Sequence, residues 1–131
     1  MRAVFDTNIL IDYFNGHPKA KEEIELYVFR AISIITYIEI SIGLHDFEEI
    51  ESIKAFLHTF DIINIDLPLA ERAAAIRKKY KLKIPDALIL ATAEHNQCLL
   101  ITRNTKDFEK TIPIVRVPYV ITPPTGRVYA S

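Results

Sequence analysis

The stretch LLITRNTKDF, residues 99–108, places a dense polar cluster directly after a short apolar run. Short apolar runs bounded by polar residues are typical of strands buried in a parallel sheet. Ligand sites in such sheets gather at the carboxyl ends of the strands, which is where residues 102–107 would lie. Three structural alternatives remain open: Asp107 could cap a one-turn helix, Asn104 could be a turn residue, and Phe108 could anchor the loop in the core.

The rest of the chain alternates between the same kinds of pattern. Strands are expected at residues 3–5, 31–35, 62–65, 98–101 and 114–115, and helices at residues 7–15, 18–27, 46–59, 68–80 and 85–96, with a further helix capped by Thr36. This alternation predicts an α/β fold whose parallel sheet of four to five strands is covered on both faces. We expect one domain over residues 1–117 and an extended tail over residues 118–131, where Pro118, Pro123, Pro124 and Gly126 cluster.

Composition restricts the class of protein. The chain has 131 residues, 50% hydrophobic and 25% charged, which is typical of a single globular domain. With 16 basic and 17 acidic residues, nucleic-acid binding would have to depend on local patches. Cys98 is the one cysteine, so neither an internal disulfide nor a cysteine-based zinc site is expected. We expect a cytoplasmic protein without a membrane span, because the apolar stretches are too short to cross a bilayer.

Asp6 and Asp86 stand where strands end or helices begin. Asp6 follows the first strand, and Asp86 follows Pro85 in the first turn of its helix. Both have a structural alternative, since a carboxylate caps a helix well and is stabilised by the positive end of the helix dipole.

Glu39 interrupts an apolar helical pattern. Ile35, Ile38 and Ile42 lie at spacings that predict one buried stripe together with Glu39. A buried carboxylate costs several kcal/mol unless it is paired or binds a cation. Glu39 is therefore a candidate metal ligand, with a salt bridge to a nearby Lys or Arg as the alternative.

The four acidic positions, Asp6, Glu39, Asp86 and Asp107, could converge on one edge of the sheet. Carboxylates brought together need a counter-charge, and hard divalent cations such as Mg²⁺ supply it. The four histidines are scattered along the chain, which argues against softer metals.

These motifs resemble those of the PIN-domain family, and in particular VapC-like toxin ribonucleases of type II toxin–antitoxin systems. The resemblance is carried, over about residues 1–117, by Asp6-Thr7-Asn8, Glu39, Pro85-Asp86-Ala87 and residues 102–108. It implies a three-layer α/β/α sandwich and an endoribonuclease that depends on Mg²⁺ or Mn²⁺. It also implies that Asp6, Glu39, Asp86 and Asp107 hold the metal, that Thr7 and Asn8 orient Asp6, and that Thr102 lies beside the metal. Many family members have Asp where this chain has Asn104, which leaves a second metal site open.

The resemblance also implies a reaction and partners. A metal-activated water would attack the RNA phosphodiester in line and leave a 3′-hydroxyl and a 5′-phosphate. A cognate antitoxin with a DNA-binding portion and a homodimer are expected by the same resemblance. Tyr13, Phe14 and the helix over residues 46–59 could dock such a partner, although a core role is the simpler interpretation.

Candidate RNA contacts come from two basic segments. Residues 77–83 hold five basic side chains and lead into Asp86; Lys83 is the nearest of them. Most of this run is equally explained as a solvated helix end. Arg103 and Lys106 flank the acidic positions and are the better candidates for phosphate contact.

Two rival functions remain. The first is a PIN-like module that binds RNA or protein without cutting, which missing acids would mark. The second is a phosphohydrolase or receiver domain, but the former requires a second Asp where Asn8 stands and the latter requires an adjacent acidic pair.

Overall fold

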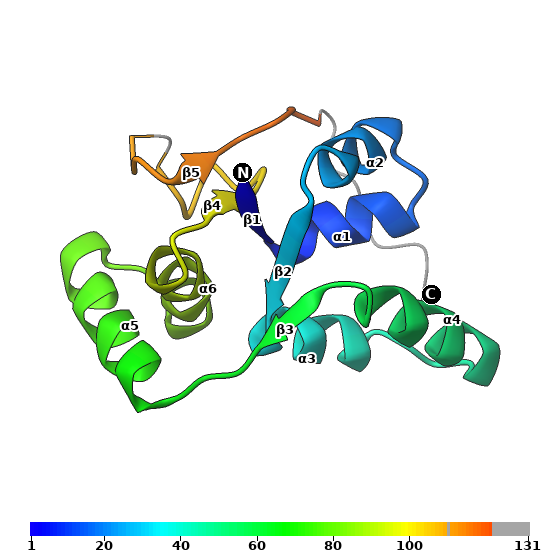
Figure 1. The fold of residues 1–131 in the computed structure, drawn as a ribbon, viewed down its shortest axis with the longest axis horizontal. Coiled ribbons are helices and arrows are strands. Elements are labelled where there is room, and N and C mark those ends of the chain that lie inside the picture. The colour runs from blue at the N-terminus through cyan, green and yellow to red at the C-terminus, as the bar shows by residue number, and fades with distance from the viewer. Residues whose placement is uncertain (110, 122–131) are drawn as a thin grey trace.

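A parallel sheet of five strands forms the centre of the computed structural model, which describes residues 1–109 and 111–121 (Figure 1). The strands are β1 (Arg2–Phe5), β2 (Phe29–Ser33), β3 (Asp61–Ile63), β4 (Leu99–Ile101) and β5 (Val115–Arg116), in the spatial order β3-β2-β1-β4-β5. The strand order reverses at β1, because β2 pairs with one side of it and β4 with the other. In open α/β sheets, ligands bind at the carboxyl end of such a switch point.

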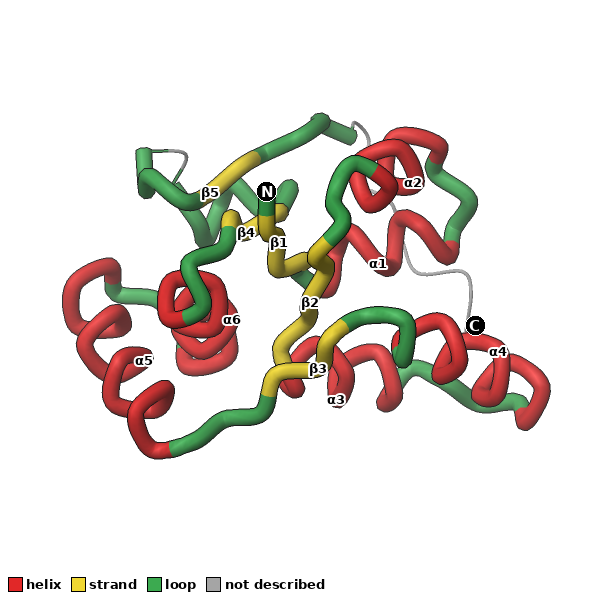
Figure 2. The backbone as a smooth tube through the Cα atoms, viewed as in Figure 1, coloured by secondary structure: helices red, strands yellow, loops and turns green. Residues whose placement is uncertain are grey.

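Helices cover both faces of the sheet. They are α1 (Thr7–Phe14), α2 (Pro18–Glu25), α3 (Ile34–Ile42), α4 (Phe47–Leu57), α5 (Leu67–Tyr80) and α6 (Ile84–His95). Figure 2 shows α5 and α6 on one side of the strands and α1, α2 and α4 on the other. The predicted α/β/α arrangement is therefore confirmed.

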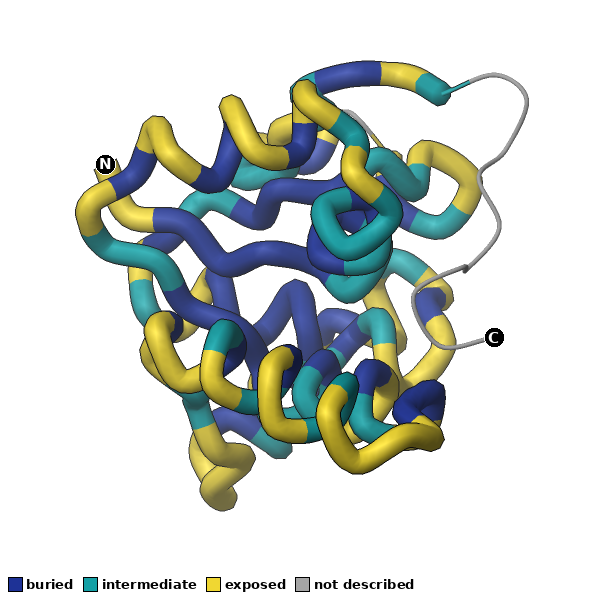
Figure 3. Tube along the Cα trace, turned by 90° about the vertical axis from the view of Figure 1, so that its right-hand side faces the viewer, coloured by how far each residue is buried: buried dark blue, intermediate teal, exposed yellow. Residues whose placement is uncertain are grey.

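Each central strand contributes to two separate cores. In β1, Ala3 and Phe5 pack with the helices α1 to α4, whereas Val4 packs with α5 and α6. In β4, Ile101 joins the first core and Leu100 the second. This division follows from the alternation of side chains along a strand, and it buries the strands on both faces (Figure 3).

The boundary between β2 and α3 differs from the prediction. The predicted strand over residues 31–35 ends at Ser33, whose hydroxyl accepts a hydrogen bond from the amide of Ile35 (3.1 Å). Ser33 is thus the N-cap of α3, and Thr36, predicted to be the cap, is buried within the helix. Ile34 and Ile35 suit a strand by propensity, but the capping hydrogen bond starts the helix before them.

The predicted tail is described only in part. Residues 117–121 follow β5 without helix or strand, and Tyr119 is buried. The remainder of the tail lies outside the described residues. Within the described part of the chain, every helix is too short or too polar to cross a bilayer.

Candidate active site

Asp6 and Thr102 meet where β1 and β4 end. The amide of Asp6 donates to the carbonyl of Ile101, so the pairing of the two strands continues into the site. The Asp6 carboxylate accepts hydrogen bonds from the amide of Thr7 (2.8 Å), from Thr102 Oγ1 (2.8 Å) and from Asn8 Nδ2 (3.1 Å). Asp6 caps α1 and also lies at the switch point of the sheet. It is therefore both a helix cap and a residue at a typical ligand position, the two roles that the sequence left open.

The electrostatic surroundings of Asp6 disfavour its charged form. Its side chain is buried, with 5% of the residue exposed. Burial raises the pKa of Asp6 to about 6, although hydrogen bonds from Thr102 and Thr7 act in the opposite direction. The nearby carboxylates of Asp86 and Glu39 raise this pKa further. A cation in this place would relieve both the desolvation and the repulsion.

Glu39 lies near Asp6 but is exposed, which corrects the predicted buried stripe. Ile38 and Ile42 are also exposed, by 48% and 74%, and α3 buries Thr36 and Ile40 instead. The predicted buried stripe is wrong because α3 contacts β2, β3, α1 and α6 and buries only Thr36 and Ile40. Glu39 is nevertheless tied to the first motif, since Thr7 Oγ1 donates to Glu39 Oε1 (2.6 Å) and lies 3.0 Å from Thr36 Oγ1.

Asp86 is half-buried in the first turn of α6. Burial raises its pKa, and the charges of Asp107 and Glu39 raise it further, whereas Lys83 lowers it. A carboxylate that only stabilises the helix dipole would not need to lie close to the other acidic side chains. The charges of Asp107 and Glu39 instead raise the pKa of Asp86, and those of Asp86 and Glu39 raise the pKa of Asp6, which shows that the four side chains lie close together.

Asp107 is held by the turn that Asn104 forms. Asn104 Nδ2 donates to Asp107 Oδ2 (2.8 Å), and the amide of Asp107 donates to Asn104 Oδ1 (3.1 Å). The amide of Asn104 in turn donates to Thr102 Oγ1 (3.0 Å). Phe108 is fully buried beneath this loop, so Asn104 is a turn residue and Phe108 is the core anchor, as the structural alternatives predicted.

Arg103 forms an ion pair inside the protein. Its guanidinium donates to both carboxylate oxygens of Asp12, at 2.5 and 2.8 Å, and Tyr119 also donates to Asp12 (2.8 Å). Asp12 is fully buried. Two Arg103 nitrogens, Nε and Nη2, donate to Asp12, and the predicted contact of Arg103 with a substrate phosphate stays a prediction.

Asp12 was missed by the sequence analysis. The signal was available, since Asp12 follows Ile9, Leu10 and Ile11 within the apolar run of α1. A carboxylate in such a run implies a buried partner. The partner could not be named from the sequence, because Arg103 is far away along the chain.

The other predicted surfaces have simpler roles. Tyr13 stacks on Phe56 with ring centroids 4.6 Å apart, and Phe14 packs edge-on against the same ring. These side chains therefore join α1 to α4 in the core. Lys83 and Lys106 are exposed.

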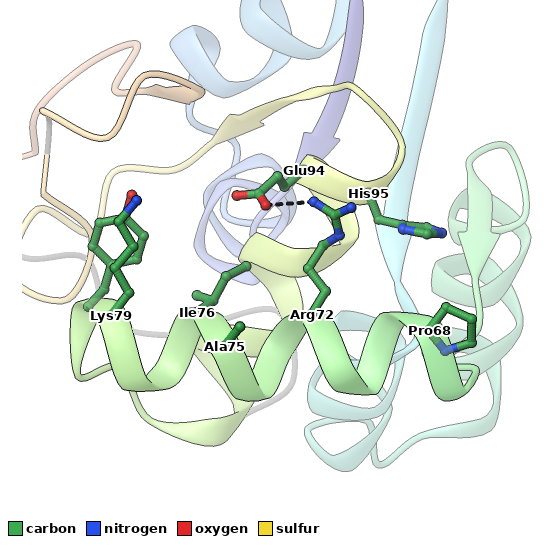
Figure 4. Close-up of a pocket in the computed structure, with 8 residues that line it drawn as sticks. Pro68, Arg72, Ala75, Ile76, Lys79, Glu94 and His95 are labelled. Carbon is green, nitrogen blue, oxygen red and sulfur yellow. Dashed lines mark hydrogen bonds and ion pairs between the residues drawn. The ribbon is translucent and has the colours of Figure 1, made fainter.

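A separate cavity lies between α5 and α6, and none of the four acidic positions lines it (Figure 4). Its volume is about 420 Å³, and an ion pair between Arg72 and Glu94 (2.7 Å) crosses it beside His95. Glu94 follows Asp86 by eight residues on α6, which is about 12 Å along a helix. This cavity is not part of the candidate site.

The donors of the candidate site are carboxylate, amide and hydroxyl oxygens, which suit hard divalent cations. Within residues 1–109 and 111–121, no three His, Cys, Asp or Glu side chains form a ready-made metal site. The donor types are those of a hard divalent cation, which can be held by one or two carboxylates and several waters.

Three comparisons relate the chain to known proteins. A family model described as PIN domain matches residues 3–112. Ribonuclease VapC1 of Methanocaldococcus jannaschii is 32% identical over 115 residues, which cover 83% of this chain and 80% of that protein.

The chain is also similar to chains in solved structures. A toxin–antitoxin complex from Klebsiella pneumoniae contains a chain that is 50% identical, with a TM-score of 0.86 and coverage of 91% of this chain and 99% of that one. A chain of VapBC2 from Rickettsia felis, bound to a promoter DNA fragment, is 25% identical, with a TM-score of 0.75 and coverage of 88% and 98%. The fold, the order of the acidic positions and these similarities together show that the chain belongs to the PIN-domain family.

Proposed function

We propose that this protein is the ribonuclease toxin of a toxin–antitoxin pair and cleaves RNA phosphodiester bonds with a divalent cation, Mg²⁺ or Mn²⁺. The observation that carries this proposal is the buried Asp6 carboxylate, which is repelled by Asp86 and Glu39. A buried carboxylate near two other carboxylates lowers the stability of the folded protein unless a bound cation neutralises their charge. The similarity to ribonuclease VapC1 supports RNA as the substrate.

The metal would be held by Asp6, Glu39, Asp86 and Asp107, with waters as the remaining ligands. When bound, Mg²⁺ or Mn²⁺ activates water for attack and neutralises charge on the phosphodiester. The exposed Glu39 would act through an intervening water, whereas Asp6, whose orientation its hydrogen bonds fix, would coordinate the metal directly.

The surrounding side chains orient these acids. Thr7, Asn8 and Thr102 hold Asp6 through hydrogen bonds, and Thr7 also holds Glu39. Asn104 holds Asp107 in the same manner. Ligands that are fixed before the metal arrives lose less entropy on binding it, which favours affinity.

Partners follow from the relatives. The Klebsiella and Rickettsia structures are toxin–antitoxin complexes, so we propose that a cognate antitoxin binds and inhibits this protein. We also propose that the protein is a homodimer, and that residues 1–117 form the PIN domain.

The test is RNA cleavage by the antitoxin-free protein with Mg²⁺, with Mn²⁺ and with EDTA. Cleavage should require the metal and should be lost in Asp6→Asn and in Asp86→Asn. Asp61→Asn is the matched control, because Asp61 is exposed at the start of β3, the end of the sheet opposite to the site. Folded protein that cuts no RNA with either metal would favour the alternative, a PIN-like module that binds RNA or protein without cutting.

A further inference from the structure

A cleft of about 220 Å³ lies beside Asp107, between the turn that joins α5 to α6 and the loop after β4. Three lysines line it, Lys81 and Lys83 from the first segment and Lys106 from the second. Two acidic residues, Asp107 and Glu109, line it as well, so the lysines outnumber the acids by one. Asp107 belongs to both the cleft and the acidic neighbourhood.

The turn that carries Lys81 and Lys83 is rigid. Lys81 adopts a left-handed conformation (φ 59°) and its amide donates to the carbonyl of Arg77 (2.8 Å). Arg77 Nη1 donates to the carbonyl of Leu82 (2.5 Å), and Leu82 is buried. The cleft wall on this side is therefore fixed before any ligand arrives.

The opposite wall is fixed as well. Lys106 lies within the turn that the Asn104–Asp107 hydrogen bonds close. Phe108 and Ile112 are buried beneath it. The three lysines are exposed, and they line the cleft from two segments that hydrogen bonds and buried side chains hold in place.

The charges in the cleft are free to act on a ligand. None of the three lysines forms an ion pair with another described residue. Lys83 also lowers the pKa of Asp86, which means that its charge reaches the acidic neighbourhood. A polyanion with one phosphate at the acids would thus find the next positive charges in this cleft.

We propose that this cleft binds the backbone phosphate of the nucleotide next to the scissile bond, as a second phosphate subsite that reads no base. This inference rests on the proposed ribonuclease function. The volume is below the roughly 300–1,000 Å³ of sites that enclose a drug-sized ligand. It suits a phosphate and part of its ribose, and lysine contacts to phosphate position a strand without specifying its sequence.

The test measures binding of short single-stranded RNAs of different sequence to the metal-free protein as a function of salt. The cleft variant combines Lys81→Gln, Lys83→Gln and Lys106→Gln. The control combines Lys19→Gln, Lys21→Gln and Lys54→Gln, which removes equal charge from α2 and α4 on the other face of the sheet. Five of the six lysines are exposed and Lys54 is half-buried, so both variants should fold; thermal melts check this.

The cleft variant should reduce the slope of log K against log salt by about 0.7, since loss of one phosphate contact to a single strand removes about that much. The loss should be equal for all RNA sequences, and the control should keep the slope of the unaltered protein. An unchanged slope in the cleft variant, or a loss confined to particular bases, would overturn the subsite. Cleavage by the unaltered protein is scored separately, so its absence would count against the proposed function and not against the cleft.

Discussion

Asp12 on α1 and Arg103 after β4 form a bidentate ion pair, and the Asp12 carboxylate is fully buried. Asn8, also on α1, accepts a further hydrogen bond from the amide of Arg103 through its Oδ1 (3.3 Å). Together these contacts hold α1 against the loop that leads to Asp107. Tyr119 adds a hydrogen bond from the C-terminal segment. This ion pair therefore supports the candidate site without containing any of its proposed metal ligands.

Replacing Arg103 by Ala should destabilise the protein by about 3–5 kcal/mol, because it leaves the Asp12 charge buried without its partner. Chemical denaturation measures this change. Arg72→Ala is the control, since the ion pair of Arg72 with Glu94 is about two-fifths exposed and should contribute less than about 1 kcal/mol. Equal losses in the two variants would contradict the structural role of Asp12 and Arg103.

The metal-free protein should gain stability from Asp6 as the pH falls. The pKa of Asp6 is about 6 in the folded protein and 3.8 ordinarily, so the folded state binds this proton more tightly. The penalty for the charged form is complete above pH about 6 and is relieved as the pH falls towards about 4. Comparison with Asp6→Asn isolates this effect.

The free energy of unfolding of the unaltered protein, relative to that of Asp6→Asn, should rise by about 2 kcal/mol between pH about 7.5 and about 4.5. Urea denaturation in EDTA at several pH values provides the measurement. A difference that does not change with pH would show that Asp6 titrates normally.

Thr102→Val should lower the affinity for the metal and should shift the onset of metal binding to higher pH. The Thr102 hydroxyl donates to Asp6 and lowers the pKa of that carboxylate, so its loss raises the pKa above about 6. A hydrogen bond to a charged group contributes about 1.5–3 kcal/mol, which corresponds to roughly tenfold or more in affinity for Mn²⁺. Calorimetric titration with Mn²⁺ at several pH values measures both effects.

Thr92→Val is the control for this experiment. Thr92 is equally buried, but its hydroxyl donates to the carbonyl of Leu88 within α6. It should leave the affinity for Mn²⁺ unchanged. The same loss in both variants would indicate a general effect on folding.

Adding Mg²⁺ or Mn²⁺ should raise the melting temperature at neutral pH. A ligand at a hundredfold excess over its Kd stabilises the folded state by about 2.7 kcal/mol. The gain should disappear near pH 5, because carboxylate ligands must be ionised to bind. A shift that persists in Asp6→Asn would place the metal elsewhere.

The sequence alone determined the elements and their order. Apolar runs such as residues 99–101 and the alternation with helices predict a parallel sheet, because burial on both faces leaves no polar position within the strand. It also determined that Asp6 and Thr102 lie at strand ends, since strand ends are local features. Boundaries were less accurate, as Ser33 shows, because a single capping hydrogen bond moves them.

The tertiary structure alone decided which side chains meet. Glu39 is exposed, contrary to its apolar pattern, because α3 buries Thr36 and Ile40 instead. Arg103 forms its ion pair with Asp12, and the lysine cleft forms from two loops that no local pattern connects. Helical and strand periodicities are set by neighbours in the chain, whereas ion pairs and clefts depend on how distant segments pack.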